Sequence, residues 1–194
     1  DTDTYALFGQ LDSQLGERFK LVNGLRIERR LTDYQDNNSV DSDPAKTLWG
    51  GRAALEYQAS TEHLVYGAVS RGYRANGVNA AILASLDTSD DPDISAQLQE
   101  LRQFDEEYLV NYELGFKGSL LAESLQARLA VFYMDRKDQQ VRGSLVIPRP
   151  DGSTAFVDYT SNAAQGNNYG TELELNWLAS ETLALFANIG LLRT

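Results

Sequence analysis

Tyr108-Leu-Val-Asn-Tyr-Glu-Leu-Gly-Phe-Lys117 alternates between two kinds of side chain. Tyr, Val, Tyr, Leu and Phe occupy every second position, and Leu, Asn, Glu, Gly and Lys fill the positions between them. Successive side chains of a β-strand point to opposite faces of a sheet. The stretch therefore predicts a strand with one apolar face and one more polar face.

The same period of two recurs on both sides of this stretch. Leu125-Gln-Ala-Arg-Leu-Ala-Val-Phe-Tyr-Met134 follows after a short turn, and Glu172-Leu-Glu-Leu-Asn-Trp177 repeats the pattern further along the chain. By this criterion, eight strands are predicted, at residues 5–14, 19–32, 47–59, 64–74, 105–118, 125–141, 168–179 and 183–193.

The connections between these strands alternate strictly in length. Short connections fall near residues 15–18, 60–63, 119–124 and 180–182, and long ones near 33–46, 75–104 and 142–167. Turns this short cannot make a parallel crossover, so every strand is expected to pair antiparallel with its sequence neighbours. Outer-membrane barrels carry tight turns on one rim and long loops on the other. The predicted fold class is all-β: an antiparallel up-and-down transmembrane β-barrel segment, about eight strands of a larger barrel, forming one domain over residues 1–194.

Strand phase also predicts which side chains share a face. One face is expected to hold Leu21, Leu25, Leu55, Leu114, Leu129, Leu173, Leu175 and Leu185. The opposite face is expected to hold Arg26, Glu56, Glu113, Arg128, Glu172 and Glu174. A slip of one residue in any strand would exchange its two faces.

Several aromatic residues lie within a few residues of the short turns. Phe19, Tyr57, Tyr66, Phe116 and Trp177 are expected to form an aromatic girdle at the periplasmic interface of a membrane. Trp49 and Tyr133 lie near the opposite ends of their strands and are candidates for the second girdle. In a soluble protein the same aromatic residues would instead fill a core.

The long connections have local patterns of their own. Ile147-Pro-Arg-Pro-Asp-Gly-Ser153 is a turn signal, and it predicts a hairpin that extends above the membrane. Within 93–104, Ile94, Leu98 and Leu101 have helical spacing, which predicts a short amphipathic helix.

Composition excludes several classes of function. The formal net charge of −11 and the absence of a basic patch argue against nucleic acid as a partner. There is no Cys, which rules out disulfides and cysteine zinc sites. No apolar run approaches the ~20 residues of a transmembrane helix.

No enzyme activity, cofactor or metal site is expected. His63 is the only histidine and is predicted to be a solvated turn residue, without the held partner and pocket that a catalytic base needs. The acidic loop Asp87-Thr-Ser-Asp-Asp-Pro-Asp93 lacks the spacing of a calcium loop and is predicted to be solvated. No phosphate-binding loop or dinucleotide fingerprint is present.

Several stretches together resemble the barrel of TonB-dependent outer-membrane receptors. They are Tyr5-Ala-Leu-Phe-Gly-Gln-Leu11, Gly24-Leu-Arg-Ile-Glu-Arg29, Val65-Tyr-Gly-Ala-Val-Ser-Arg-Gly-Tyr-Arg74 with Asn76-Gly-Val-Asn79, Tyr112-Glu-Leu-Gly-Phe-Lys117, Ala130-Val-Phe-Tyr-Met-Asp135 with Asp138-Gln-Gln-Val141, and Asn162-Ala with Gly170-Thr-Glu-Leu-Glu174. Their order and spacing extend through nearly the whole chain. The resemblance implies a 22-stranded barrel in the bacterial outer membrane, with a plugged lumen and energy coupling through the TonB complex.

The resemblance also implies what this chain lacks. The family carries an N-terminal plug domain and ends on a strand with a terminal aromatic residue, and neither is found here. The chain is therefore expected to be an internal fragment of the barrel domain. Its expected partners are outer-membrane lipid, the plug and remaining strands, and the TonB complex.

The resemblance implies active uptake of a scarce small solute, most commonly a ferric siderophore. Arg71, Tyr73, Arg74 and Asn76 stand at the outer end of the fourth strand and are the candidate ligand-binding residues. Arg suits carboxylate or phosphate groups, and Tyr suits stacking on rings. Alternatively, the arginines only balance lumenal carboxylates such as Glu56.

Two other functions remain open at this level. The chain could be a complete eight-stranded outer-membrane barrel with a structural or adhesin role, or a soluble β-sandwich that binds carbohydrate. A sandwich would pack its leucine face against a second sheet and would need no detergent.

Overall fold

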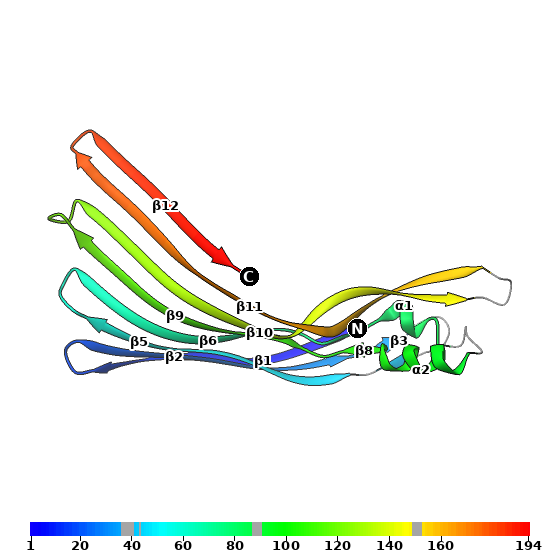
Figure 1. The fold of residues 1–194 in the computed structure, drawn as a ribbon. Coiled ribbons are helices and arrows are strands. Elements are labelled where there is room, and N and C mark those ends of the chain that lie inside the picture. Colours follow the sequence, from blue (N-terminus) through cyan, green and yellow to red (C-terminus); the bar gives the residue numbers. More distant parts are fainter. Residues whose placement is uncertain (36–40, 43, 87–90, 149–152) are drawn as a thin grey trace.

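The computed structural model describes residues 1–35, 41–42, 44–86, 91–148 and 153–194. One eight-stranded sheet dominates it, in the order β1-β2-β5-β6-β9-β10-β11-β12 (Figure 1). Its strands are β1 (Thr2–Leu15), β2 (Phe19–Thr32), β5 (Ala45–Gln58), β6 (His63–Arg74), β9 (Glu107–Leu120), β10 (Leu125–Pro148), β11 (Thr154–Ser180) and β12 (Leu183–Arg193).

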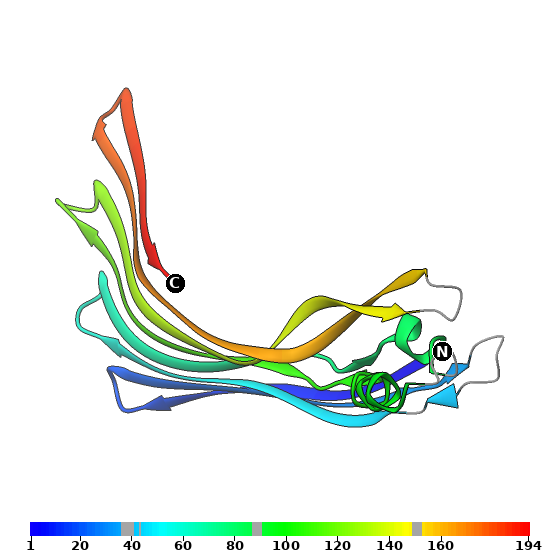
Figure 2. The same ribbon diagram turned by 45° about the vertical axis from the view of Figure 1, so that its right-hand side comes forward.

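All seven pairings within this sheet are antiparallel and join strands that follow one another in the sheet order, which confirms the predicted topology. The short turns lie along one end of the sheet and the long connections along the other (Figure 1). In the first short turn, Gly16 has a φ of 79°, a conformation that glycine adopts without steric cost. The sheet curves strongly (Figure 2), and β1 and β12 are not paired with each other, so it is an open segment rather than a closed barrel.

Two strands are much longer than predicted. Pairing between β10 and β11 continues out to Pro148 and Thr154, whereas the sequence pattern ended these strands at 141 and 168. The register shifts between Arg136 and Gln140, so the alternation is broken there although the ladder goes on. The predicted hairpin is this extension, and the centre of its turn lies outside the described residues.

The two predicted faces are confirmed by the register. Paired residues of an antiparallel ladder lie on the same face, and one row joins Leu21, Leu55, Gly67, Leu114 and Val131 across five strands. We call the side that holds the eight predicted leucines the Leu face. The opposite side, which we call the charged face, holds the six predicted Arg and Glu residues.

The Leu face is open to its surroundings. Leu7 is 79% exposed and Leu114 is 67% exposed, and among the described residues no second sheet packs on this face. A soluble sandwich would bury these side chains, so the observed fold contradicts the sandwich alternative. The open ends of the sheet likewise contradict a complete eight-stranded barrel.

The prediction for Tyr66 was wrong. Tyr66 pairs with Glu56 and Gly115, which places it on the charged face, and its hydroxyl donates to Glu113 Oε1 at 2.8 Å. The other four predicted members of the girdle near the short turns lie on the Leu face. The reason is strand phase: Val65, not Tyr66, continues the row of Tyr57 and Phe116.

The long connections pack together into a small core beyond the sheet. They contain α1 (Ala80–Leu83), α2 (Pro92–Glu100) and the short strand pairs β3 (Tyr34–Gln35) with β4 (Asp41–Ser42) and β7 (Gly77–Val78) with β8 (Gln103–Phe104). Ile82 and Leu98 from the helices are fully buried against Ile147 and Val157 of the β10–β11 extension. The long loops are thus held by a hydrophobic cluster of their own, which we call the outer core.

The predicted helix at 93–104 is α2, shifted toward the N-terminus. Asp91 caps it by accepting a hydrogen bond from the Asp93 amide at 2.9 Å, and Pro92 fits the first turn. The helix ends before Gln103, which pairs in β8 instead. Among the described residues, none of the helices has the length and apolar character to cross a membrane.

Candidate functional site

A polar hollow of about 660 Å³ opens at the outer end of the charged face. Arg30 near the end of β2 and Arg74 at the end of β6 bring two guanidinium groups to its wall. Both arginines have the strand phase of Arg26 and Glu56, so they belong to the charged face. Two carboxylates, Asp1 and Asp33, line the hollow as well, together with Thr32, Asn76 and Gln140.

Three polar atoms in this wall are buried without a hydrogen-bond partner. They are Arg30 Nε, Thr32 Oγ1 and Asn76 Oδ1, and the Asn76 side chain belongs to a residue only 7% exposed. Buried polar groups in folded proteins nearly always have a partner, so each such atom calls for an explanation. The three unpartnered atoms lie within the wall around the hollow.

The structure brings together only part of the predicted ligand set. Arg74 and Asn76 both line the polar hollow. Tyr73 pairs with Tyr108 and so has the strand phase of the Leu face, yet its side chain reaches residues of the charged face: its ring lies against Gly50 and its hydroxyl donates to Glu28 Oε2 at 3.0 Å. Tyr73 is therefore engaged within the wall of the barrel.

Arg71 lies on the other side of the sheet. It pairs with Gly51 and Val110, in the row of Leu25 on the Leu face. Its guanidinium carbon lies 4.3 Å from the ring centre of Trp49 and 4.5 Å from that of Tyr108. Arg71 and Arg74 thus face different surroundings although they are three residues apart.

A network of side-chain amides fixes the loops around the hollow. Gln140 donates to the carbonyls of Ala75 and Asp105 at 2.8 and 2.9 Å, and Asn162 donates to the Asp105 carbonyl at 3.0 Å. Lys46 forms ion pairs with Asp105 at 2.8 Å and with Glu106 at 2.9 Å. These carboxylates raise the pKa of Lys46 above its ordinary value, with Asp105 contributing most.

Arg30, Thr32 and Gln140 line the hollow but were not predicted as site residues. Arg30 and Thr32 follow the alternation of their strand, so their face was predictable, but their proximity to Asn76 was not. The sequence pattern did not indicate which face Gln140 occupies, because this residue lies at the register shift of β10.

Ion pairs and hydrogen bonds run along the rest of the charged face. Arg26 pairs with Glu28 at 2.7 Å, Lys20 with Asp12 at 2.8 Å, and Arg128 with Glu174 at 3.3 Å. Such a wall is polar and largely charge-balanced, as in the lumen of a barrel that holds water or another domain.

Aromatic residues form two rows on the Leu face. Trp49 and Tyr57 in β5, Tyr108 and Phe116 in β9, and Tyr169 and Trp177 in β11 are each eight residues apart. Eight residues at about 3.3 Å each span roughly 27 Å of strand, or about 20 Å in height at a tilt of about 40°. That is close to the ~25 Å apolar band between the aromatic girdles of outer-membrane barrels.

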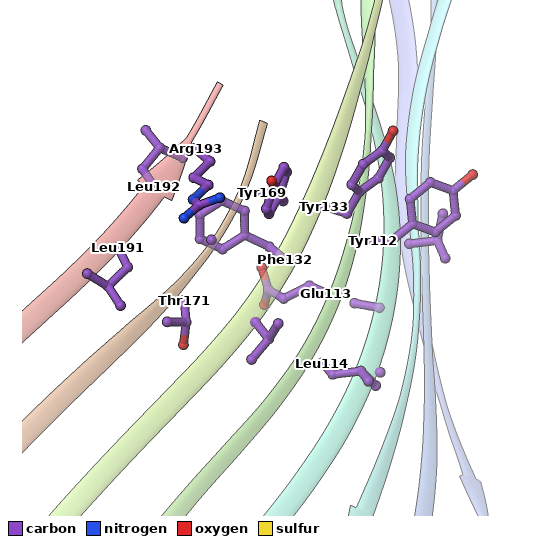
Figure 3. Close-up of a pocket in the computed structure, with 15 residues that line it drawn as sticks. Tyr112, Glu113, Leu114, Phe132, Tyr133, Tyr169, Thr171, Leu191, Leu192 and Arg193 are labelled. Carbon is purple, nitrogen blue, oxygen red and sulfur yellow. The ribbon is translucent and has the colours of Figure 1, made fainter. Parts of the chain in front are cut away.

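The outer row is visible where β9, β10 and β11 meet. Tyr112, Tyr133 and Tyr169 pair across these three strands and lie side by side (Figure 3). They line a hollow of about 950 Å³ whose walls are mainly Leu-face residues, including Leu114 and Leu191. This hollow is apolar and is formed on the side of the sheet away from Arg30 and Arg74.

His63 is not the solvated turn residue that the sequence predicted. It is the first residue of β6 and half-buried, and its ring stacks on Phe116 with 5.9 Å between ring centres. Its Nδ1 lies 2.8 Å from Ser60 Oγ. Within the described ranges, no three His, Asp or Glu side chains come together to hold a metal ion. Residues 87–90 of the predicted acidic loop lie outside those ranges.

An open antiparallel sheet with one apolar exposed face and one charge-balanced face defines a segment of an up-and-down β-barrel. The family model described as "TonB dependent receptor-like, beta-barrel" matches residues 1–193. The chain therefore belongs to the TonB-dependent receptor family, as a part of its barrel domain. Proteins of this family are transporters and not enzymes, and they lie in the outer membrane of Gram-negative bacteria.

Solved structures agree on the fold. The ferric yersiniabactin uptake receptor FyuA from Yersinia pestis superimposes with a TM-score of 0.69 at 20% identity, over 99% of this chain and 27% of that one. The copper transporter OprC superimposes with a TM-score of 0.67 at 16% identity, over 98% of this chain and 29% of that one. The alcaligin outer-membrane receptor FauA from Bordetella pertussis superimposes with a TM-score of 0.61 at 18% identity, over 98% of this chain and 30% of that one. The chain thus spans less than a third of the length of each.

Proposed function

We propose that this chain is part of an outer-membrane receptor for active uptake of a scarce solute, most commonly a ferric siderophore in this family. The observation that carries the proposal is the polar hollow at the outer end of the charged face. It holds two arginines and three buried polar atoms without partners, and it opens where the long loops gather.

The proposed ligand contacts are Arg74 and Asn76 from the predicted set, together with Arg30 and Thr32. Two guanidinium groups favour a solute that carries carboxylate or other anionic oxygen groups, since arginine donates two parallel hydrogen bonds to such groups. Tyr73 is not a proposed contact. It links side chains of the wall, because its hydroxyl donates to Glu28 and accepts from Arg26 Nε at 3.3 Å. Arg71 lies on the Leu face and is not a proposed contact.

The proposed location is the bacterial outer membrane, with the Leu face against lipid. The exposed leucines and the two aromatic rows support this placement, because in water such a surface would associate or aggregate. The remaining strands, a plug domain and the TonB complex are the proposed partners. They would close the lumen opposite the charged face and supply the energy for uptake.

The experiment is a ligand titration on the full-length protein in detergent, with a panel of ferric siderophores and cobalamin. Arg74→Gln and Asn76→Leu should each weaken binding of the solute that the wild type takes up, by roughly tenfold for a lost charged hydrogen bond of about 1.5 kcal/mol. Arg128→Gln is the matched control, because Arg128 lies on the same face but near the short turns.

Unchanged binding in both hollow variants would refute the proposed contacts. No binding of any panel member by the wild type would refute the siderophore assignment, while leaving the family membership intact.

A further inference from the structure

Beyond the eight-stranded sheet, β10 and β11 continue together as a two-stranded hairpin (Figure 1). β9 pairs with β10 only as far as Lys137, and β12 pairs with β11 only as far as Tyr169. We call the part beyond these residues, 138–148 and 154–168, the outer hairpin. Within the described residues, neither of its long edges has a neighbouring strand.

The two faces of the outer hairpin differ. Ile147 and Val157 are buried in the outer core on one face. Val146 and Phe156 pair with each other on the opposite face, where they are 48% and 72% exposed. The outer hairpin therefore presents an uncovered apolar pair beyond the end of the sheet.

Asn79 shows which backbone groups of β11 point outward. The Thr160 N–H donates to Asn79 Oδ1 at 2.9 Å, and the Thr160 carbonyl accepts from Asn79 Nδ2 at 2.7 Å. A residue of a neighbouring antiparallel strand makes the same two bonds with the residue opposite it. The backbone groups of Thr160 are therefore directed away from Arg142, its partner in β10.

The alternation of an antiparallel ladder extends this direction to Phe156 and Asp158. Hydrogen-bonded and non-hydrogen-bonded pairs alternate, so residues two and four positions before Thr160 direct their backbone groups to the same edge. Gln140 agrees with this phase, since its N–H donates outward to Glu107 Oε2 at 2.9 Å. In the described part of the chain, no loop backbone and no side chain bonds to the outward groups of Phe156 or Asp158. These groups form a free strand edge.

This edge lacks the usual protection against strand pairing. Proline or lysine commonly interrupts a free edge. The edge of β10 ends at Pro148, which has no N–H. Residues 154–158 of β11, Thr-Ala-Phe-Val-Asp, contain neither proline nor lysine and are rich in residues that favour extended backbone. A strand that continued β12 outward along β11 would meet Asn79 at Thr160 and would stop there.

The surroundings of the free edge are acidic. Asp158 is exposed, and among the described residues no Lys or Arg lies within ion-pair distance of it. The helical loop at 80–101 packs against the outer hairpin through Ile82 and Leu98. Across this loop and 138–168, the cations are Arg142 and Arg149, and the carboxylates are Asp87, Asp90, Asp91, Asp93, Glu100, Asp138, Asp151 and Asp158. Charge complementarity therefore favours a cationic partner.

We propose that the edge of β11 at residues 154–158 binds an extended, cationic polypeptide, which adds to the outer hairpin as a further strand. An extended backbone presents paired donors and acceptors about 7 Å apart, which is the spacing of the outward groups of Phe156 and Asp158. An apolar side chain of the added strand lies beside Phe156, in the row that begins with Val146, and a Lys or Arg lies near Asp158. This surface is separate from the polar hollow, and the inference does not rest on uptake of a solute.

The test measures peptide binding by the full-length protein in detergent. The probe is a fluorescent peptide of alternating lysine and valine, and its control is the same peptide with every backbone nitrogen methylated. The wild type should bind the probe at least about tenfold more tightly than the control, because methylation removes the donors of two or more hydrogen bonds. A peptide of alternating glutamate and valine should bind more weakly than the probe.

Three variants test the residues of the edge. Phe156→Pro removes the outward N–H without breaking the ladder to β10, and Phe156→Ala is its matched control because it keeps that N–H. The proline variant should bind the probe about fivefold more weakly than the alanine variant, which corresponds to one hydrogen bond. Asp158→Lys should also weaken binding of the probe. Glu181→Lys makes the same change of charge in a short turn at the other end of the sheet and should have no effect.

Site-resolved hydrogen exchange is the second measurement. The amides of Phe156 and Asp158 should exchange fast in the free protein and slowly when the probe is bound. Slow exchange in the free protein would overturn the inference, because another loop of the same protein would then cover the edge. Protection that rises with protein concentration would overturn it in favour of a second copy. Absence of probe binding, or equal binding of the probe and its methylated control, would overturn it as well, since the backbone would then not be recognised.

Discussion

Asn79 and Thr160 are joined by two hydrogen bonds although they are 81 residues apart in the chain. The Asn79 side-chain amide donates to the Thr160 carbonyl at 2.7 Å, and its oxygen accepts from the Thr160 backbone amide at 2.9 Å. The same amide donates to the Leu101 carbonyl at 2.8 Å. One buried side chain therefore ties both ends of the helical loop to the long β10–β11 hairpin.

Asn79→Ala should release this loop without unfolding the sheet. The substitution leaves buried backbone groups of Leu101 and Thr160 unpaired, which costs about 1–3 kcal/mol. Amide hydrogen exchange should therefore become faster in residues 80–102 and stay unchanged in β9. Asn176→Ala, at an exposed position of β11, is the matched control. Equal exchange in both variants would show that the outer core alone holds the loop.

Leu98→Ala should open the outer core. Leu98 is fully buried against Ile82 and Ile147, and removing a buried leucine side chain costs about 2–5 kcal/mol. Limited proteolysis of the full-length protein should then cut within the long loops first. Leu114→Ala removes the same atoms from a side chain 67% exposed on the Leu face, and it should leave the loops resistant. Cleavage at the same rate in both variants would refute the outer core as a stabilising unit.

Gly115→Ala should disturb the wall of the lumen. A Cβ at Gly115 would lie 2.2 Å from the Tyr66 ring, so the ring must move and its hydrogen bond to Glu113 is at risk. Such overpacking typically costs about 1–3 kcal/mol. Thermal unfolding in detergent should show a lower Tm for this variant than for Gly72→Ala, because a Cβ at Gly72 meets open space.

The cause can be checked with a second substitution. Tyr66→Ala in the Gly115→Ala background removes the clash and should recover part of the lost Tm. If the double variant loses more Tm than the two single variants lose together, the result would argue against a clash with this ring.

The ion pairs of Lys46 with Asp105 and Glu106 should hold the segment before β9 in place over a wide pH range. Its pKa is raised above the ordinary lysine value of 10.5, so the stabilisation is complete below that value and is lost as pH rises through the higher folded value. The Lys46 side chain is 35% exposed, and solvent screening limits the effect to under about 1 kcal/mol. Lys46→Gln should therefore speed hydrogen exchange near Asp105 equally from neutral pH to about pH 10. A difference that disappears already at neutral pH would contradict this assignment.

The chain by itself should bind ligand weakly or not at all. Its long connections supply only part of a rim, and each backbone residue that becomes ordered costs roughly 1–2 kcal/mol of conformational entropy. Calorimetric titration of the detergent-folded chain with ferric siderophores and cobalamin checks this. Submicromolar binding of any of them would show that the polar hollow is a complete site.

The sequence by itself determined the fold class and the two faces of the sheet. Alternation in Tyr108–Lys117 is a local property, because neighbouring side chains of an extended backbone must point in opposite directions. All eight predicted leucines share a face for that reason. Short turns likewise fixed the antiparallel order, since they leave no room for a crossover. The resemblance in motif order identified the family, and the family match confirmed it.

Only the tertiary structure decided which residues meet. Arg30 and Asn76 line one hollow because β2 and the end of β6 are brought together through β5, and no local pattern encodes that proximity. Arg71 and Arg74 look equivalent in the sequence, but strand phase sends them to opposite faces. The partners of Asn79 and Gln140 are backbone groups far along the chain. Such contacts depend on how the long loops pack, and that packing is a property of the assembled sheet and outer core rather than of any single segment.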